Sequence, residues 1–159
     1  MLRFLYTLSF VCILVLTACK KDSFTTSSTD TISFSTDTLF FDTVFSTIGS
    51  STRKFKIYNK NNESIKISSL KLAGGENSIF RLNVNGVPGI SFKNLEIKSK
   101  DSMWVYADVT VDPSNTNLPY VVKDSLEFKT NGNIQDVNLI AFGQNAIFHK
   151  ADAGSSSFI

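Results

Sequence analysis

Cysteine and histidine, the residue types that catalytic and metal sites use most, are scarce in this chain. Its 159 residues include two cysteines and one histidine. The histidine, His149, lies beyond the last stretch with strand character. A catalytic triad or a zinc site would need that imidazole fixed beside partner residues. We therefore expect no enzymatic activity, no cofactor and no metal ion, and we interpret His149 as a surface residue.

The chain also lacks an excess of charge of one sign. It has 16 Lys and Arg against 14 Asp and Glu, which gives a formal net charge of +2, and the two signs are interspersed. A nucleic-acid partner would need basic side chains clustered on one face. Electrostatic attachment to a membrane surface would need a similarly one-sided distribution. The charge pattern therefore argues against both kinds of partner.

Only one long apolar run is present, from Phe4 to Leu16, after a single positive charge at Arg3. Its length fits the hydrophobic region of a secretory signal peptide, which has about 7–15 apolar residues. A membrane-spanning helix needs about 20. The run ends in small residues followed by Lys20 and Lys21. These features predict a signal peptide rather than a permanent span.

The end of this run, Leu16-Thr17-Ala18-Cys19, resembles the lipobox of bacterial lipoproteins: an aliphatic residue, two small residues and a cysteine. The resemblance implies transfer of a diacylglyceryl group to the Cys19 thiol, cleavage between Ala18 and Cys19, and further acylation such as palmitate. Two or three acyl chains, at ~0.8 kcal/mol per buried CH₂, make membrane attachment stable. The alternative is an ordinary signal peptide that happens to precede a cysteine.

Processing at this site removes Cys12 and converts Cys19 to a thioether. The mature chain then has no free thiol, no disulfide and no cysteine metal site, so packing alone must hold its core. Lys20 follows the cysteine, where an aspartate would retain a lipoprotein in the inner membrane. We expect a lipid-anchored protein of the cell outer membrane, with periplasmic and surface-facing orientations both open.

Composition divides the chain into four regions. Residues 1–18 are the predicted signal peptide. Residues 19–31 are rich in Ser and Thr and carry too little apolar surface to fold alone, so we expect a flexible tether with a reach of about 20 Å. Residues 32–148 form one predicted domain, and residues 149–159 a flexible polar tail.

Alternation of apolar and polar residues dominates from Ile32 onward, and no stretch keeps a helical period. The pattern predicts an all-β fold, a single antiparallel β-sandwich of about 7–8 short strands. Met103 to Val111 is the strongest strand. A change of parity at Ser68-Ser69 predicts a bulge or bend. Asn85-Gly86 and Pro88-Gly89 predict turns, and Asn131-Gly132-Asn133 predicts a hairpin.

Several segments in order resemble Ig-like modules of the ASPM/SPD-2/Hydin type, between about Asp42 and Asn145. The segments are FDTVFSTIGSSTRKFKIYNKNNESIKISSLKLAGG, Phe80-Arg81-Leu82, Asp101-Ser102, Val111-Asp112-Pro113 and Ala141-Phe142-Gly143-Gln144. With the lipobox, the chain resembles the N-terminal domain of outer-membrane lipoproteins from Bacteroidota-type bacteria. The resemblance implies a binding or scaffold module and no catalytic residues. Such relatives commonly continue into a larger C-terminal region, sometimes a parallel β-helix.

Trp104 and Tyr106 are the candidate binding residues, because they alternate with the aliphatic residues of the strongest strand and should face away from the core. Paired aromatics can stack on sugars or anchor a partner protein. Alternatively, they pack under a loop or the tether, or belong to the core with the opposite parity. Ile140 and Phe142 show a similar excess of apolar residues on both strand faces, which suggests a docking surface.

Two acidic residues, Asp108 and Asp112, flank the end of the strongest strand. Calcium needs several oxygens that converge on one point, and no dense acidic loop of that kind occurs. Asp112 before Pro113 is ordinary turn chemistry. We interpret neither as a metal ligand.

The sequence therefore predicts a lipid-anchored, non-enzymatic envelope lipoprotein that presents an Ig-like binding or scaffold module. Its partners are the membrane, through the lipid on Cys19, and a protein or glycan. Two alternatives remain open: a glycan-binding module of a polysaccharide-uptake system, and the stalk domain of a larger enzyme or β-helix protein.

Overall fold

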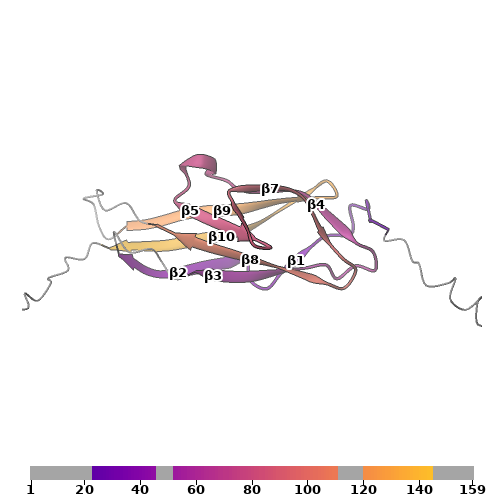
Figure 1. The fold of residues 1–159 in the computed structure, drawn as a ribbon, viewed down its shortest axis with the longest axis horizontal. Coiled ribbons are helices and arrows are strands. Elements are labelled where there is room, and N and C mark those ends of the chain that lie inside the picture. Colours follow the sequence, from indigo (N-terminus) through magenta and orange to yellow (C-terminus); the bar gives the residue numbers. More distant parts are fainter. Residues whose placement is uncertain (1–22, 46–51, 111–119, 145–159) are drawn as a thin grey trace, which may run out of the picture.

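The computed structural model describes residues 23–45, 52–110 and 120–144, which form two packed β-sheets (Figure 1). The first sheet has the order β1-β3-β8-β5-β6 and the second has the order β2-β10-β9-β4-β7. Their bounds are β1 Ser33–Phe34, β2 Thr38–Phe45, β3 Arg53–Tyr58, β4 Ile65–Leu72, β5 Phe80–Val84, β6 Val87–Gly89, β7 Ser91–Ile97, β8 Ser102–Val109, β9 Tyr120–Thr130 and β10 Asn133–Gln144. The predicted all-β sandwich is confirmed.

The described residues form more strands than the sequence indicates, for two local reasons. The opening stretch, residues 31–45, divides at Ser35–Asp37 into β1 and β2, which belong to different sheets. The turn expected at Asn85-Gly86 is confirmed, whereas Pro88-Gly89, also expected to be a turn, lies in the short edge strand β6 that follows it. Both turn residues have positive φ, the conformation that a two-residue hairpin needs.

Strand β2 and the last described strand, β10, run parallel, which differs from the purely antiparallel sandwich that we expected. β2 pairs with β10 from Thr38↔Asn138 to Phe45↔Gln144, with a register shift at Ala141/Phe142. The other strand pairs are antiparallel. Residue parity shows which face a side chain occupies but carries no information on strand direction.

Alternation along the strands buries one face of each sheet, as predicted. Four phenylalanines are fully buried, Phe41, Phe55, Phe80 and Phe128. The predicted bulge is confirmed, because the β4–β9 register shifts between Ile67 and Ser69, which allows both Ile67 and Leu70 to face the core. The predicted β9–β10 hairpin is also confirmed, with positive φ at Asn131 and Gly132.

The second half of the expected tether is docked on the domain. From Ser23 to Thr31 the backbone is described, Phe24 forms a parallel bridge with Ser64, and Thr25 is buried. This differs from the free linker that we expected. The segment is ordered because side chains far away in the sequence donate hydrogen bonds to its backbone carbonyl groups.

Residues 1–22 and 149–159 lie outside the described residues, and so do the signal peptide and polar tail predicted there. The only helical element described is the 3₁₀ turn Gly75–Asn77, and no described helix is long and apolar enough to cross a membrane.

Candidate binding surface

The outer face of β8 carries the two aromatic residues that the sequence singles out. Met103, Val105, Ala107 and Val109 of this strand are buried. Trp104 and Tyr106, on the opposite face, are 39% and 37% exposed. Their predicted outward orientation is confirmed, and the docked N-terminal segment lies elsewhere, against β4 and the β9–β10 hairpin.

Two lysines of the neighbouring strand β3 surround the tryptophan. The β3–β8 register places Lys56 opposite Trp104 and Lys54 opposite Tyr106. The Lys56 and Lys54 ammonium groups lie 4.6 and 4.9 Å from the centre of the Trp104 ring. The rings of Trp104 and Tyr106 are 6.4 Å apart and inclined by 35°. These four side chains, which we call the β8 platform, combine apolar ring surface with two positive charges held by cation–π contacts.

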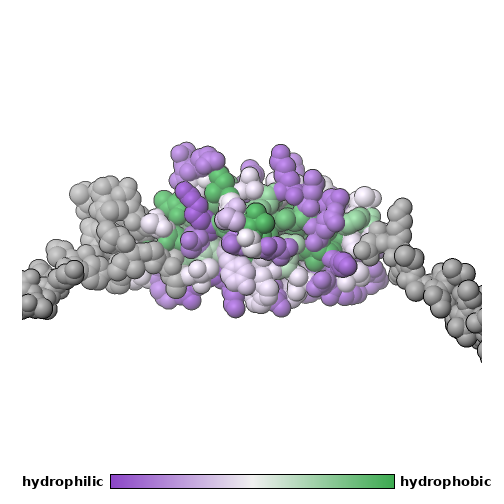
Figure 2. All heavy atoms as spheres, viewed as in Figure 1, coloured by the Kyte–Doolittle hydropathy of each residue, from purple (hydrophilic) through white to green (hydrophobic). Residues whose placement is uncertain are grey.

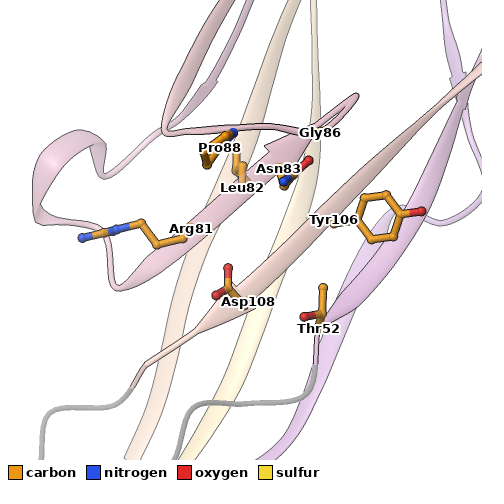
Figure 3. A pocket seen from close by; sticks show the side chains of 8 residues that line it. All are labelled: Thr52, Arg81, Leu82, Asn83, Gly86, Pro88, Tyr106 and Asp108. Atoms are coloured by element: carbon orange, nitrogen blue, oxygen red, sulfur yellow. The ribbon is translucent and has the colours of Figure 1, made fainter.

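A shallow depression of about 530 Å³ adjoins the β8 platform, between β8 and the β5–β6 hairpin (Figure 3). Tyr106 forms one wall, and Asn83 and Pro88 of the hairpin lie across from it. The other lining residues are Thr52, Arg81, Leu82, Gly86 and Asp108. Hydroxyl, carboxamide and carboxylate groups beside an aromatic ring can hydrogen-bond and stack on a hydrophilic ligand.

The residues considered for catalysis or metal binding are not brought together where the structure describes them. Asp108 is an exposed residue that lines the depression. Asp112 and His149 lie outside the described residues, as do Ala18 and Cys19. Within the described ranges, no three His, Cys, Asp or Glu side chains come close enough to hold a metal ion.

A second exposed surface lies on the outer face of the other sheet. Phe142 is 44% exposed and Ile140 is half-buried, as the apolar excess on β10 suggests. Cross-strand pairing adds Phe40 opposite Ile140 and Val121 opposite Phe142. We call these four residues the β10 patch. Sequence analysis missed Phe40 and Val121, although the doublets Phe40-Phe41 and Val121-Val122 each place one apolar residue on either face of a strand.

Most of the face seen in Figure 2 is hydrophilic, with hydrophobic residues in small groups between the charged ones. Single exposed apolar residues are normal on soluble domains. Adjacent pairs that match in register across strands, as in the β10 patch, are less common and mark candidate contact surfaces.

Comparison of the sequence with protein-family models and with curated proteins gives no match. Among solved structures, the chain is similar to a protein of unknown function from Porphyromonas gingivalis W83, with 12% identity and a TM-score of 0.53, over 79% of this chain and 50% of that one. It is also similar to a family 123 glycoside hydrolase from Clostridium perfringens, with 8% identity and a TM-score of 0.51, over 74% of this chain and 28% of that one.

An ASH/PapD-like domain of human CEP192 has 13% identity and a TM-score of 0.47, over 81% of this chain and 94% of that domain. The chain thus spans half or less of the first two proteins. At these identities the similarity is one of fold, and the fold is an all-β sandwich of two sheets.

Proposed function

We propose that this protein is a cell-envelope lipoprotein of the outer membrane, whose Ig-like sandwich serves as a non-enzymatic binding or scaffold module. The support for the anchor is the sequence Leu16-Thr17-Ala18-Cys19, placed directly after an apolar run. The further resemblance to ASPM/SPD-2/Hydin-type domains of Bacteroidota-type lipoproteins belongs to the same proposal.

The β8 platform is the observation that carries the binding role. A tryptophan and a tyrosine side by side on a rigid central strand lose little conformational entropy when they bind a partner. The adjoining depression adds hydroxyl, carboxamide and carboxylate groups. Rings flanked by hydrogen-bonding groups suit a sugar chain, so a glycan is the ligand class that we favour for this face.

A second candidate role, that of a stalk, draws its support from the β10 patch. β10 is the last strand described and ends at Gln144, close in sequence to Ile140 and Phe142. An apolar patch beside the exit of the chain suits the docking of a neighbouring domain. In this role the sandwich would hold a following domain in a fixed orientation.

The lipid anchor is tested by the substitution Cys19→Ala. Cells that express the full chain are fed a clickable fatty acid, and the protein is then probed for label and for its presence in the membrane fraction. We expect the wild-type chain to be labelled and membrane-bound, and Cys19→Ala to lose the label completely, because alanine has no thiol to acylate. Cys12→Ala, in the predicted signal peptide, is the control and should keep the label. Undiminished labelling of Cys19→Ala would contradict the anchor.

The β8 platform is tested by the substitution Trp104→Ala on a glycan array. We expect glycans retained by the wild-type protein to bind the variant at least about tenfold more weakly, or ~1.4 kcal/mol, as for a central aromatic contact residue. Phe142→Ala removes a similarly exposed aromatic residue from the opposite sheet and should leave binding unchanged. A wild-type protein that retains no glycan, or equal losses in both variants, would remove the glycan from the proposal.

A further inference from the structure

The N-terminal segment Ser23–Ile32 is fixed to one end of the sandwich along its whole length. At its start, the Ser64 amide donates to the Ser23 carbonyl over 3.0 Å, and the Thr25 amide donates to the Ser64 carbonyl over 2.9 Å. The Ser23 hydroxyl donates to Glu63 over 2.8 Å. At its end, Ile32 is inserted into the core with 2% exposure.

Between these two points, carboxamide side chains from distant parts of the chain hold the segment. Each donates its NH₂ group to one backbone carbonyl: Asn133 to Ser28 at 2.8 Å, Asn131 to Asp30 at 3.1 Å, Asn61 to Thr31 at 3.0 Å and Gln135 to Ile32 at 2.9 Å. Four donors matched to carbonyls of one short segment fix its path on the domain. The position of Ser23 relative to the sandwich is therefore defined.

The loops at this same end are joined to one another. The Ser99 hydroxyl donates to the Asn61 carbonyl over 3.1 Å, and the Lys100 ammonium donates to the Lys60 carbonyl over 2.6 Å. We call this end the anchor pole; it comprises Ser23–Ile32, the β3–β4 loop, the β7–β8 turn and the β9–β10 turn. β10 ends at the opposite pole, so the described chain enters and leaves the elongated sandwich at opposite ends (Figure 1).

We propose that the anchor pole faces the membrane and lies against its phospholipid headgroups, an inference that rests on the proposed lipid at Cys19. Four residue steps separate Cys19 from the fixed Ser23, and they span at most about 14 Å. A free tether from Cys19 to Ile32 would allow the domain to tumble at about 20 Å. Docking of Ser23–Ile32 on the domain removes that freedom and places the anchor pole, rather than the opposite end of the sandwich, next to the lipid.

The described charges of the anchor pole are balanced, with three lysines and three carboxylates, so they permit contact with headgroup phosphates but do not select this pole. Lys60, Lys98 and Lys100 are exposed there, and none of them forms an ion pair with a described carboxylate. The carboxylates at this pole accept hydrogen bonds from the chain itself: Glu63 from Ser23, Asp30 from Thr25 and Asp101 from the Ser102 amide. Lys20 and Lys21 lie between the lipid and Ser23. The anchor holds the protein at the membrane, and the docked segment, rather than these charges, sets the orientation.

Fluorescence quenching in vesicles tests this orientation. The full chain is expressed, and the acylated product, identified by its mass, is reconstituted into phosphatidylglycerol-containing vesicles with a nitroxide on the headgroup. A fluorophore is attached through a clickable side chain at Lys100, on the anchor pole, or at Lys123. Lys123 is the matched lysine, about 24 Å from Thr130 along β9. We expect most of the fluorescence to be lost at Lys100 and little at Lys123.

Two variants separate docking from anchoring. A Gly/Ser insertion of about twelve residues between Asp22 and Ser23 should lift the domain and abolish the difference between the two sites. The double variant Asn133→Ala/Gln135→Ala removes two of the four carboxamide contacts and should reduce the difference, and its unfolding curve shows whether the sandwich remains folded. Equal quenching at both sites in the acylated wild-type protein, or stronger quenching at Lys123, would overturn the inference. Absence of acylation would instead overturn the proposed anchor.

Discussion

Replacement of Phe128 by alanine is expected to lower the free energy of unfolding by about 3–5 kcal/mol. Phe128 is 1% exposed, and its ring lies 4.8 Å from Phe34 and 6.3 Å from Phe55, centre to centre. It therefore joins β9 of one sheet to β1 and β3 of the other. Alanine would leave a cavity that rigid strands on both sides cannot close. Against a total stability of about 5–15 kcal/mol for a domain, this single change removes a large share.

Urea unfolding measures this loss, with Trp104 as the probe, because it is the only tryptophan in the chain. Phe40→Ala is the matched control, since the same side chain is removed at a site that is 60% exposed. Its effect should stay within about 0.5 kcal/mol. Similar losses in the two variants would contradict the assignment of Phe128 to the core between the sheets.

Replacement of Asn59 by aspartate is expected to cost about 3 kcal/mol, although the two side chains have nearly the same shape. Asn59 is 1% exposed, and its NH₂ group donates to the carbonyls of Glu63, Ile97 and Lys98 at 2.8–3.1 Å. A carboxylate cannot donate, so all three carbonyls would lose the Asn59 hydrogen bond, although the Lys98 carbonyl still accepts from the Asp101 amide. A negative charge would also be buried among them. The β3–β4 loop and the β7–β8 turn, both parts of the anchor pole, would lose their buried side-chain connection and keep the Ser99–Asn61 and Lys100–Lys60 hydrogen bonds.

Asn62→Asp introduces the same charge in the same loop, at an exposed residue, and serves as the control. We expect its unfolding midpoint in urea to match the wild type within the usual range of surface substitutions, about 0.5 kcal/mol. Hydrogen exchange should show the loss in Asn59→Asp as faster exchange of the Asn59 and Asp101 region, where the Asn59 amide donates to the Asp101 carbonyl over 2.9 Å. A wild-type midpoint for Asn59→Asp would show that the carboxamide contributes nothing.

Periodicity was sufficient to predict the face that each strand buries. The alternation along β8 correctly placed Trp104 and Tyr106 outward, and the change of parity at Ser68-Ser69 correctly indicated a bulge, because both depend only on the two-residue repeat of a strand. The division of the opening stretch into β1 and β2 and the parallel pairing of β2 with β10 were not predictable in this way. Both depend on which strand is the neighbour, and a strand's own sequence pattern carries little of that information.

The docked N-terminal segment was missed for a different physical reason. Its Ser- and Thr-rich composition correctly indicates that it cannot fold alone. It is ordered because side chains such as Asn131 and Asn133, about a hundred positions away, donate to its carbonyls. Asparagine is common in turns, so the predicted hairpin alone explains why asparagines occur at these positions. Nothing in the local sequence reveals that their side chains also bind the N-terminal segment. The candidate binding surface was also predicted only in part. The sequence indicates its two aromatic residues, but the two lysines beside Trp104 could be identified only from the pairing of β3 with β8 in the structure.

The intact mass of the protein extracted from cell membranes tests the central claim, a lipid-anchored sandwich, most directly. The account predicts a chain that begins at Cys19 and carries the added mass of a diacylglyceryl group, with or without a third acyl chain. The added mass should be confined to the N-terminal peptide after proteolysis. A chain that begins at any other residue, or one that begins at Cys19 without added lipid, would contradict the account.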